Sequence, residues 1–400
     1  MSNTTEFGGW PRPPRWVWAI AAVAAVAVLA GVVGARIGLH RATPTSAVTS
    51  PTAAAGNGDL RMPPHKPARM AGQPLPREAG VRLMLGGQRP AWLWVTTGKT
   101  EPIRGLPRRD NGYQLIRVTS GWAALPFPGN GVSCDNCAPR PMPAYYIADG
   151  SREASSLGAA DFVAPAATTG AVWLVSYHAG AAMPATRGTA QEFSLSGAAL
   201  GPRRRLPRGY VIDQGTAAGL LLVPELAGKG AVPYQLWEPG TRRVSRFFQN
   251  VIAVSADEIA WMPVCPARCS VHVLNLDHGR GRVIPLLGRS KAYAGAFSTD
   301  GRLLALQVTA RVEASGRVEA TRLAVADVAD GGLTAVPGTT IGAGIGVDFG
   351  WQAGGGRLVA DVGLQDAWQV AVWRPGAARL YVAVTRAPAD SWPIAGPGPY

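Results

Sequence analysis

Short runs of alternating apolar and polar residues dominate the chain from residue 81 onward, and they predict β-strands rather than helices. One unit recurs, in which an apolar strand is followed by a turn containing Gly or Asp and then by a second strand. Two further strands precede several of these units, as in residues 250–263 and 292–308. The copies begin near Trp92, Tyr145, Glu192, Gln235, His272, Leu323 and Gln369. Seven four-stranded units at intervals of 37 to 53 residues predict an all-β, seven-bladed β-propeller.

Three tryptophans, Trp122, Trp173 and Trp261, occupy similar places in the strands of their units. A large apolar side chain at a repeated strand position is expected to pack between neighbouring sheets. The first unit lacks a clear innermost strand. Residues 391–394, Ser-Trp-Pro-Ile, are the candidate for that strand, and they would close the ring, although proline is unfavourable inside a sheet.

A long apolar run near the N-terminus is of a different kind. Residues 16–35 contain no charged side chain, and these 20 residues are enough to cross a hydrocarbon core of about 30 Å. Trp16 and Trp18 stand where interfacial aromatic residues belong. A cleaved signal peptide is the alternative, but the run exceeds the usual apolar region of about 7–15 residues. We therefore predict a cytoplasmic tail at residues 1–15 and a single uncleaved transmembrane helix at residues 16–35.

Orientation does not follow from the flanking charges, because two arginines precede the predicted span and two follow it. The short N-terminal side and the closely spaced cysteines favour a cytoplasmic N-terminus and an extracytoplasmic C-terminal domain. Residues 36–80 are rich in Pro, Ala, Thr and Gly and are predicted to be a disordered linker. The propeller domain is then expected over residues 81–400.

The most regular repeat reads Ala-Phe-Ser-Thr-Asp-Gly-Arg-Leu-Leu-Ala, at residues 296–305. It resembles the repeat of TolB-like and WD-type β-propellers, which has a Phe-Ser-Pro-Asp-Gly turn, a strand and a later Val-Asp strand ending. Thr299 replaces the proline, and Asp327 stands where the Val-Asp ending falls. In looser form the resemblance covers residues 81–385, and it implies the fold rather than an activity. With its anchor and linker, the chain looks like membrane-anchored envelope proteins of actinobacteria.

The net charge of +14 adds a possible class of partner. Residues 1–90 carry 10 Lys and Arg against 3 Asp and Glu, so half of the excess, +7, lies in the first quarter of the chain. A basic segment beside a bilayer favours anionic head groups. We expect no nucleic-acid partner, because the domain is predicted to lie outside the cytoplasm.

Four cysteines form two close pairs, Cys134 with Cys137 and Cys265 with Cys269. A redox motif would need a helix start in a βαβ setting, whereas Cys134 and Cys137 lie among Gly and Pro between strands. A metal site shared by all four would have to join the second and fifth repeats, which are well apart in a seven-fold ring. Two local disulfides are the preferred interpretation.

Arginine clusters are the candidate anion-binding residues, and they fall at the ends of two successive repeats. The first cluster is Arg203, Arg204, Arg205 and Arg208, and the second is Arg242, Arg243 and Arg246. Both are expected on the outermost strand of a blade. There a solvated edge that discourages strand pairing is the alternative to anion binding.

Motifs for catalysis are missing from the sequence. It contains no G-x-S-x-G and no phosphate-binding G-x-x-x-x-G-K-[ST], and its five histidines have no metal-ligand spacing, so we predict no catalytic residue, cofactor or metal. The leading hypothesis is a binding or scaffolding module of the cell envelope, with an envelope protein or anionic polymer as partner. The alternatives are a lyase or glycan-cleaving enzyme with its site in the propeller channel, and a sensor or accessory domain.

The predicted topology can be tested by adding protease to intact spheroplasts. The C-terminal domain is expected to be degraded, because the anchor would place it outside the membrane. Full protection of that domain, with degradation only after lysis, would contradict the orientation.

Overall fold

The computed structural model describes twelve stretches of the chain. They are residues 69–127, 141–178, 187–224, 233–241, 243–265, 268–288, 290–312, 318–343, 345–352, 356–364, 366–388 and 391–394. Within these stretches no helix is long and apolar enough to cross a membrane. The predicted span at residues 16–35, Arg242, Cys134 and Cys137 lie outside them.

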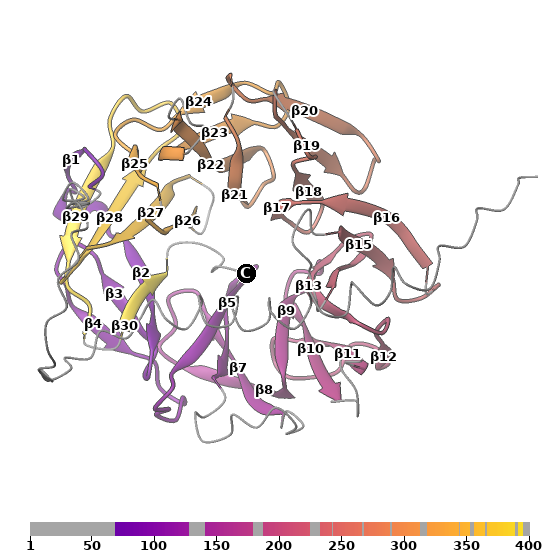
Figure 1. The fold of residues 1–400 in the computed structure, drawn as a ribbon. Coiled ribbons are helices and arrows are strands. Elements are labelled where there is room, and N and C mark those ends of the chain that lie inside the picture. The colour runs from indigo at the N-terminus through magenta and orange to yellow at the C-terminus, as the bar shows by residue number, and fades with distance from the viewer. Residues whose placement is uncertain are drawn as a thin grey trace, which may run out of the picture. The chain divides into compact units, whose positions relative to one another are not determined.

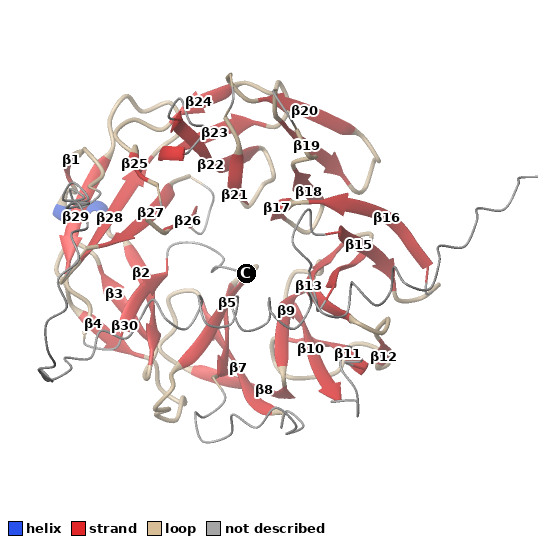
Figure 2. Cartoon of the chain, in the orientation of Figure 1, coloured by secondary structure: helices blue, strands red, loops and turns tan. Residues whose placement is uncertain are grey.

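The described chain consists almost entirely of β-strands, which form six hydrogen-bonded sheets (Figure 2). The only helical element in these stretches is the 3-10 helix η2 (Arg77–Ala79). The all-β prediction is therefore confirmed. The largest sheet contains β4 (Thr100–Pro102), β3 (Ala91–Trp94), β2 (Arg82–Gly87), β5 (Tyr113–Val118), β6 (Gly121–Pro126), β7 (Met142–Ala148) and β8 (Ala154–Ala160), with β30 (Ser391–Ile394) paired to β2.

The next three sheets follow in chain order, each with four strands. They contain β9 (Phe162–Pro165), β10 (Ala171–His178), β11 (Arg187–Ser194) and β12 (Arg204–Arg205); β13 (Tyr210–Thr216), β14 (Gly219–Pro224), β15 (Pro233–Glu238) and β16 (Arg243–Gln249); and β17 (Val251–Val254), β18 (Glu258–Trp261), β19 (Ser270–Asn275) and β20 (Gly281–Pro285).

Two five-stranded sheets complete the set. One contains β21 (Ala292–Phe297), β22 (Leu303–Val312), β23 (Val318–Asp327), β24 (Leu333–Ala335) and β25 (Ile341–Gly342). The other contains β26 (Val347–Trp351), β27 (Leu358–Gly363), β28 (Trp368–Trp373), β29 (Tyr381–Thr385) and β1 (Gln73–Pro74).

Most strands that follow one another in a sheet are antiparallel neighbours; the exceptions are β25, which pairs with β23, the strands β4 and β5, which are not paired with each other, and β1, which is parallel to β29. The sheets follow one another around a common axis (Figure 1). Strands β5, β9, β13, β17, β21 and β26 lie nearest that axis. This arrangement is a β-propeller. The turn at residues 297–301 forms as its sequence predicts, because Ser298 Oγ donates to the Asp300 carboxylate and Gly301 adopts a φ of 70°.

Apolar clusters fill the junctions between neighbouring sheets, in place of one central core. Leu221 and Leu236 meet Ile259 at the junction of the β13–β16 and β17–β20 sheets, and equivalent clusters lie between the other neighbours. Trp173 and Trp261 each pack in such a cluster, and Trp122 packs in the equivalent cluster inside the largest sheet, where β2 and β3 meet β5–β7, as their repeated position predicted. The stability of the fold therefore depends on contact between blades.

The C-terminal strand joins the beginning of the ring. Strand β30 pairs antiparallel with β2, with Met84 opposite Ile394 and Gly87 opposite Ser391. The prediction that residues 391–394 supply the missing innermost strand is confirmed. Pro393 is tolerated because β30 has no neighbouring strand on its axial side in the described part of the sheet.

An N-terminal strand extends the β26–β29 sheet and was not expected. Residues up to 80 were assigned to a disordered linker, but β1 pairs in parallel with β29, and Met70 is buried. The Gln369 side chain accepts from the Met70 N–H at 2.7 Å and donates to the Met70 carbonyl at 2.9 Å. The folded part therefore begins before residue 81, because these backbone groups have buried partners far along the chain.

Gly338 gives a test of this N-terminal docking. A Cβ at residue 338 would lie 1.8 Å from the Ala71 carbonyl oxygen. Gly376 has a similar positive φ but open space around it, so Gly376→Ala is the matched control. We expect Gly338→Ala to lower the free energy of unfolding by about 1–3 kcal/mol more than the control does. It should also speed trypsin cleavage after Arg77. Equal effects of the two variants would contradict the docking.

Candidate functional site

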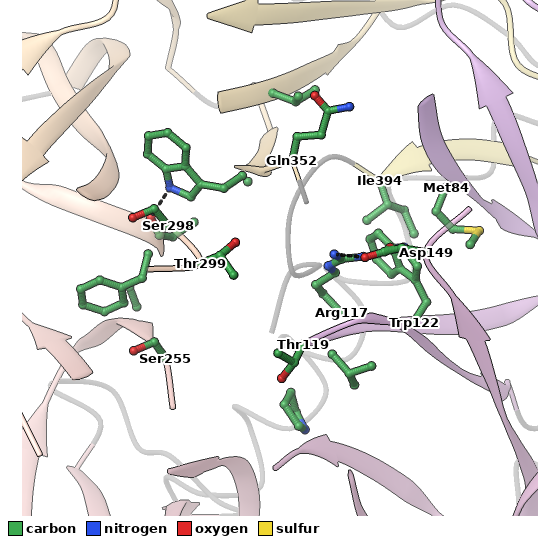
Figure 3. A pocket seen from close by; sticks show the side chains of 18 of the residues that line it. Met84, Arg117, Thr119, Trp122, Asp149, Ser255, Ser298, Thr299, Gln352 and Ile394 are labelled. Atoms are coloured by element: carbon green, nitrogen blue, oxygen red, sulfur yellow. Dashed lines mark hydrogen bonds and ion pairs between the residues drawn. The ribbon is translucent and has the colours of Figure 1, made fainter. Parts of the chain in front are cut away.

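A pocket of about 320 Å³ opens where the innermost strands end, and we call it the axial pocket (Figure 3). Strands β5, β17, β21 and β26 reach it with Val118, Val254, Phe297 and Trp351. Every one of the six sheets contributes to its wall. A site assembled in this way cannot be read from any one segment of the sequence.

An arginine held by two indole rings forms part of the wall. Arg82 on β2 lies opposite Trp94 on β3, and Met84 lies opposite Trp92. The guanidinium carbon of Arg82 is 4.9 Å from the ring centre of Trp94 and 5.6 Å from that of Trp92. Trp92 is itself fixed, because its Nε1 donates to the Ser151 carbonyl at 2.6 Å. Cation–π contact with both rings therefore fixes where the charge of Arg82 lies.

The second arginine of the pocket is neutralised by a carboxylate. Arg117 on β5 donates to both carboxylate oxygens of Asp149, at 2.5 and 2.7 Å, and it stacks over Trp122 at 5.3 Å. Figure 3 shows this pair beside Trp122. A two-point contact between a guanidinium and a carboxylate fixes both groups. Asp149 is therefore engaged as a structural partner of Arg117.

Hydroxyl and amide groups form the facing wall. Ser255, Ser298, Thr299 and Gln352 lie across the pocket from Arg117 in Figure 3. They come from three sheets, at the turns that follow β17, β21 and β26. The pocket thus has a cationic side and an uncharged side that carries hydroxyl and amide groups.

Carboxylates on the innermost strands are few and separated. In the described chain these strands carry only Asp213 on β13 and Asp348 on β26, and no histidine. Burial raises the pKa of Asp213 to about 6. No group of three or more His, Cys, Asp or Glu among the described residues is placed to hold a metal ion. The innermost strands of the described chain therefore hold no cluster of side chains that could serve together as general acid and general base.

Glu258 carries the largest raised pKa among the described carboxylates, at about 7. Burial is the main cause, and the nearby charges of Asp257 and Asp300 add to it. The Oε2 atom of Glu258 has no hydrogen-bond partner in the described structure. This side chain does not line the axial pocket, so its protonation affects stability rather than the wall of the site.

The candidate arginine clusters lie where the sequence predicted, on the outermost strands of two neighbouring sheets. Arg204 and Arg205 form β12, and Arg203 and Arg208 flank it. Arg243 and Arg246 lie on β16 and are exposed. The structure adds Arg280 and Arg282 at β20, the outermost strand of the next sheet, which sequence reasoning did not single out. The sequence could have indicated them, because they stand in the next repeat at the position equivalent to that of the two predicted clusters.

The cysteine pair within the described residues has disulfide geometry. The Cα atoms of Cys265 and Cys269 are 5.3 Å apart, and their sulfur atoms are bonded. The bond lies in the connection between β18 and β19, so it closes a local loop as the sequence predicted for this pair.

Comparison with known proteins gives similarity of fold alone. No family model and no curated sequence matches this chain. The fold is similar to TolB from Acinetobacter baumannii, with 11% identity over 74% of this chain and 76% of TolB, at a TM-score of 0.39. It is also similar to the β-propeller domain of the Trilobed protease from Pyrococcus furiosus, with 10% identity over 69% of this chain and 85% of that one, at 0.44.

A third similar structure is an oligogalacturonate lyase from Vibrio parahaemolyticus, with 6% identity over 81% of this chain and 91% of that one, at a TM-score of 0.45. No activity follows from similarity at this level, because proteins with unrelated functions share this fold.

The raised pKa of Glu258 predicts a pH-dependent stability. The folded state binds a proton up to about pH 7, while an ordinary glutamate has a pKa near 4.5. Stability contributed by this proton is therefore full below about pH 4.5 and is lost as the pH rises toward 7. Glu258→Gln should raise the free energy of unfolding at pH 8 by up to about 3 kcal/mol, with no gain at pH 4.

Urea unfolding from pH 4 to 8 measures this effect, with Glu153→Gln, a change at an exposed side chain, as the control. The pKa of Asp213 is also raised, to about 6, so the stability of both variants still falls as the pH rises toward 6. A Glu258→Gln profile parallel to that of the unmodified protein would contradict the assignment.

Proposed function

We propose that this protein is a membrane-anchored, extracytoplasmic binding module of the cell envelope, built on a seven-bladed β-propeller, and that its partner is an anionic envelope polymer. The count of seven blades treats the largest sheet as two blades, divided where the fewest paired residues join its strands. Its two halves, β30-β2-β3-β4 and β5–β8, are joined by the single pair Gly87 and Tyr113.

The observation that carries the proposal is a run of unpaired positive charge along three consecutive outermost strands, which we call the basic rim. Its described members are Arg203, Arg204, Arg205, Arg208, Arg243, Arg246, Arg280 and Arg282. Strands β12, β16 and β20 contain no carboxylate, and none of these arginines forms an ion pair with a described residue. Like charges gathered on one side attract a polyanion.

Arginines beside the outer strands β4 and β8 have carboxylate partners, unlike those of the rim. Arg152 lies 3.0 Å from the Glu101 carboxylate, and Arg104 lies 3.3 Å from that of Glu153. These pairs belong to the β4 and β8 side of the molecule. The arginines of these two outer strands are thus neutralised, unlike those of the rim.

Exposed apolar side chains interleave with the rim arginines. Phe247 is 68% exposed, Val283 56% and Leu287 69%. An edge that only needed to discourage strand pairing would be served by charge alone. Apolar groups beside arginines favour a contacting surface over a solvated one.

The envelope location rests on the predicted anchor at residues 16–35. As a random coil, a linker of about 33 residues, 36–68, would hold the domain roughly 30 Å from the bilayer. Such a tether gives the rim access to polymers of the envelope on the outer side of the membrane.

An enzyme working in the ring axis, the alternative function, would need acid and base groups at the axial pocket. The only carboxylate in the pocket lining is Asp149, which Arg117 engages at two points, and the described lining contains no histidine. The geometry therefore favours binding over lyase or glycan-cleaving chemistry.

A charge-matched pair of variants tests the proposal. Full-length protein in nanodiscs would be titrated with polyglutamate, a model polyanion, and with isolated envelope polymer. Arg243→Ala with Arg246→Ala should weaken binding about tenfold at low salt, because two uncompensated charges are lost. Arg379→Ala with Arg386→Ala, which removes two exposed arginines from the β26–β29 sheet, should change it less than about twofold. Equal loss in both variants, or product formation from the polymer, would overturn the proposal.

A further inference from the structure

Arg82 in the axial pocket is a fixed cation that has no counter-ion among the described residues. It is half-buried, and no described carboxylate lies within ion-pair distance of it. The other arginine of the pocket, Arg117, has Asp149 as its partner. Withdrawing a charge from water without an opposite charge is unfavourable, so an anion entering the pocket would be stabilised at Arg82.

The guanidinium of Arg82 is also held in place before any ligand arrives. It stacks on Trp92 and Trp94, and its Nη2 lies so close to Gly150 that a Cβ there would be only 2.9 Å away. A planar donor group that is already oriented loses little conformational freedom when it binds a carboxylate. The arrangement is therefore suited to a carboxylate rather than to mobile salt ions.

The facing wall indicates what else the ligand carries. Thr299 and Gln352 line the pocket, and their side chains make no hydrogen bond with other described residues; Ser298 and Ser255 stand beside them. Hydroxyl and amide groups both donate and accept, so they match the hydroxyl groups of a ligand. Bare phosphate or acetate at Arg82 would leave this wall unused.

The size of the pocket sets the scale of the ligand. A volume of about 320 Å³ is at the lower end of the range for small-molecule sites. Trp122 and Trp351 add apolar surface to the lining.

We propose that the axial pocket binds an acidic sugar unit, with its carboxylate on Arg82 and its hydroxyl groups toward Thr299 and Gln352. The site is separate from the basic rim, because none of the rim arginines lines the pocket. The inference therefore holds or fails independently of the polymer binding proposed for the rim.

Calorimetry and tryptophan fluorescence on the full-length protein in nanodiscs would test the site, with glucuronate, glucose and acetate as probes. Glucuronate should bind at least about tenfold more tightly than glucose, which lacks the charge, and than acetate, which lacks the hydroxyl groups. The proposal would be overturned if glucose, or acetate, bound as tightly as glucuronate.

Variants on the two walls separate the two contacts. Arg82→Gln should weaken glucuronate binding at least about tenfold, whereas Arg104→Gln, an exposed arginine outside the pocket, should not change it. Thr299→Val with Gln352→Ala should weaken glucuronate binding but leave acetate binding unchanged, and this pair keeps the test valid if Arg82→Gln fails to fold. Unchanged glucuronate affinity in a folded Arg82→Gln protein would disprove the site. The rim variants should bind glucuronate normally.

Discussion

A ring of sheets closes only if its first and last segments make contact, and here β30 pairs with β2 while β1 pairs with β29. Four residues from the end of the described chain cover the axial edge of a strand that begins at Arg82. Without β30, the edge of β2 would present unpaired backbone groups. Both the junction cluster around Met84 and Ile394 and the adjoining wall of the axial pocket depend on this pairing.

Closure also explains why the two candidate binding regions differ in character. The axial pocket lies where strands from every sheet end, so its groups are held by packing and cation–π contacts. The basic rim lies on outermost strands, where each arginine is solvated and only charge and exposed apolar surface are available. The first region is suited to one small ligand in a defined pose, and the second to an extended polyanion without a fixed register.

Local pattern predicted those parts of the fold that local sequence determines. The strand–turn–strand units, the turn at residues 297–301 and the outermost position of the arginines followed from strand periodicity and turn chemistry. The docking of Met70 on Gln369 did not, because the contact joins residues 299 positions apart. The pocket was missed for the same reason: Arg82, Asp149 and Thr299 meet only in the closed ring. The one sequence feature that pointed to the pocket was Arg82, a charged residue in the apolar strand that precedes Trp92 and Trp94.

Hydrogen exchange at β30 and β2 tests ring closure most directly. The account predicts that the amides of Ser391, Trp392 and Ile394 and those of β2 are protected together, and as strongly as those of β6, which lies inside its sheet; Pro393 has no amide hydrogen. Fast exchange at residues 391–394 with β6 still protected would show that the ring is open at this point. The axial pocket would then lack one of its walls.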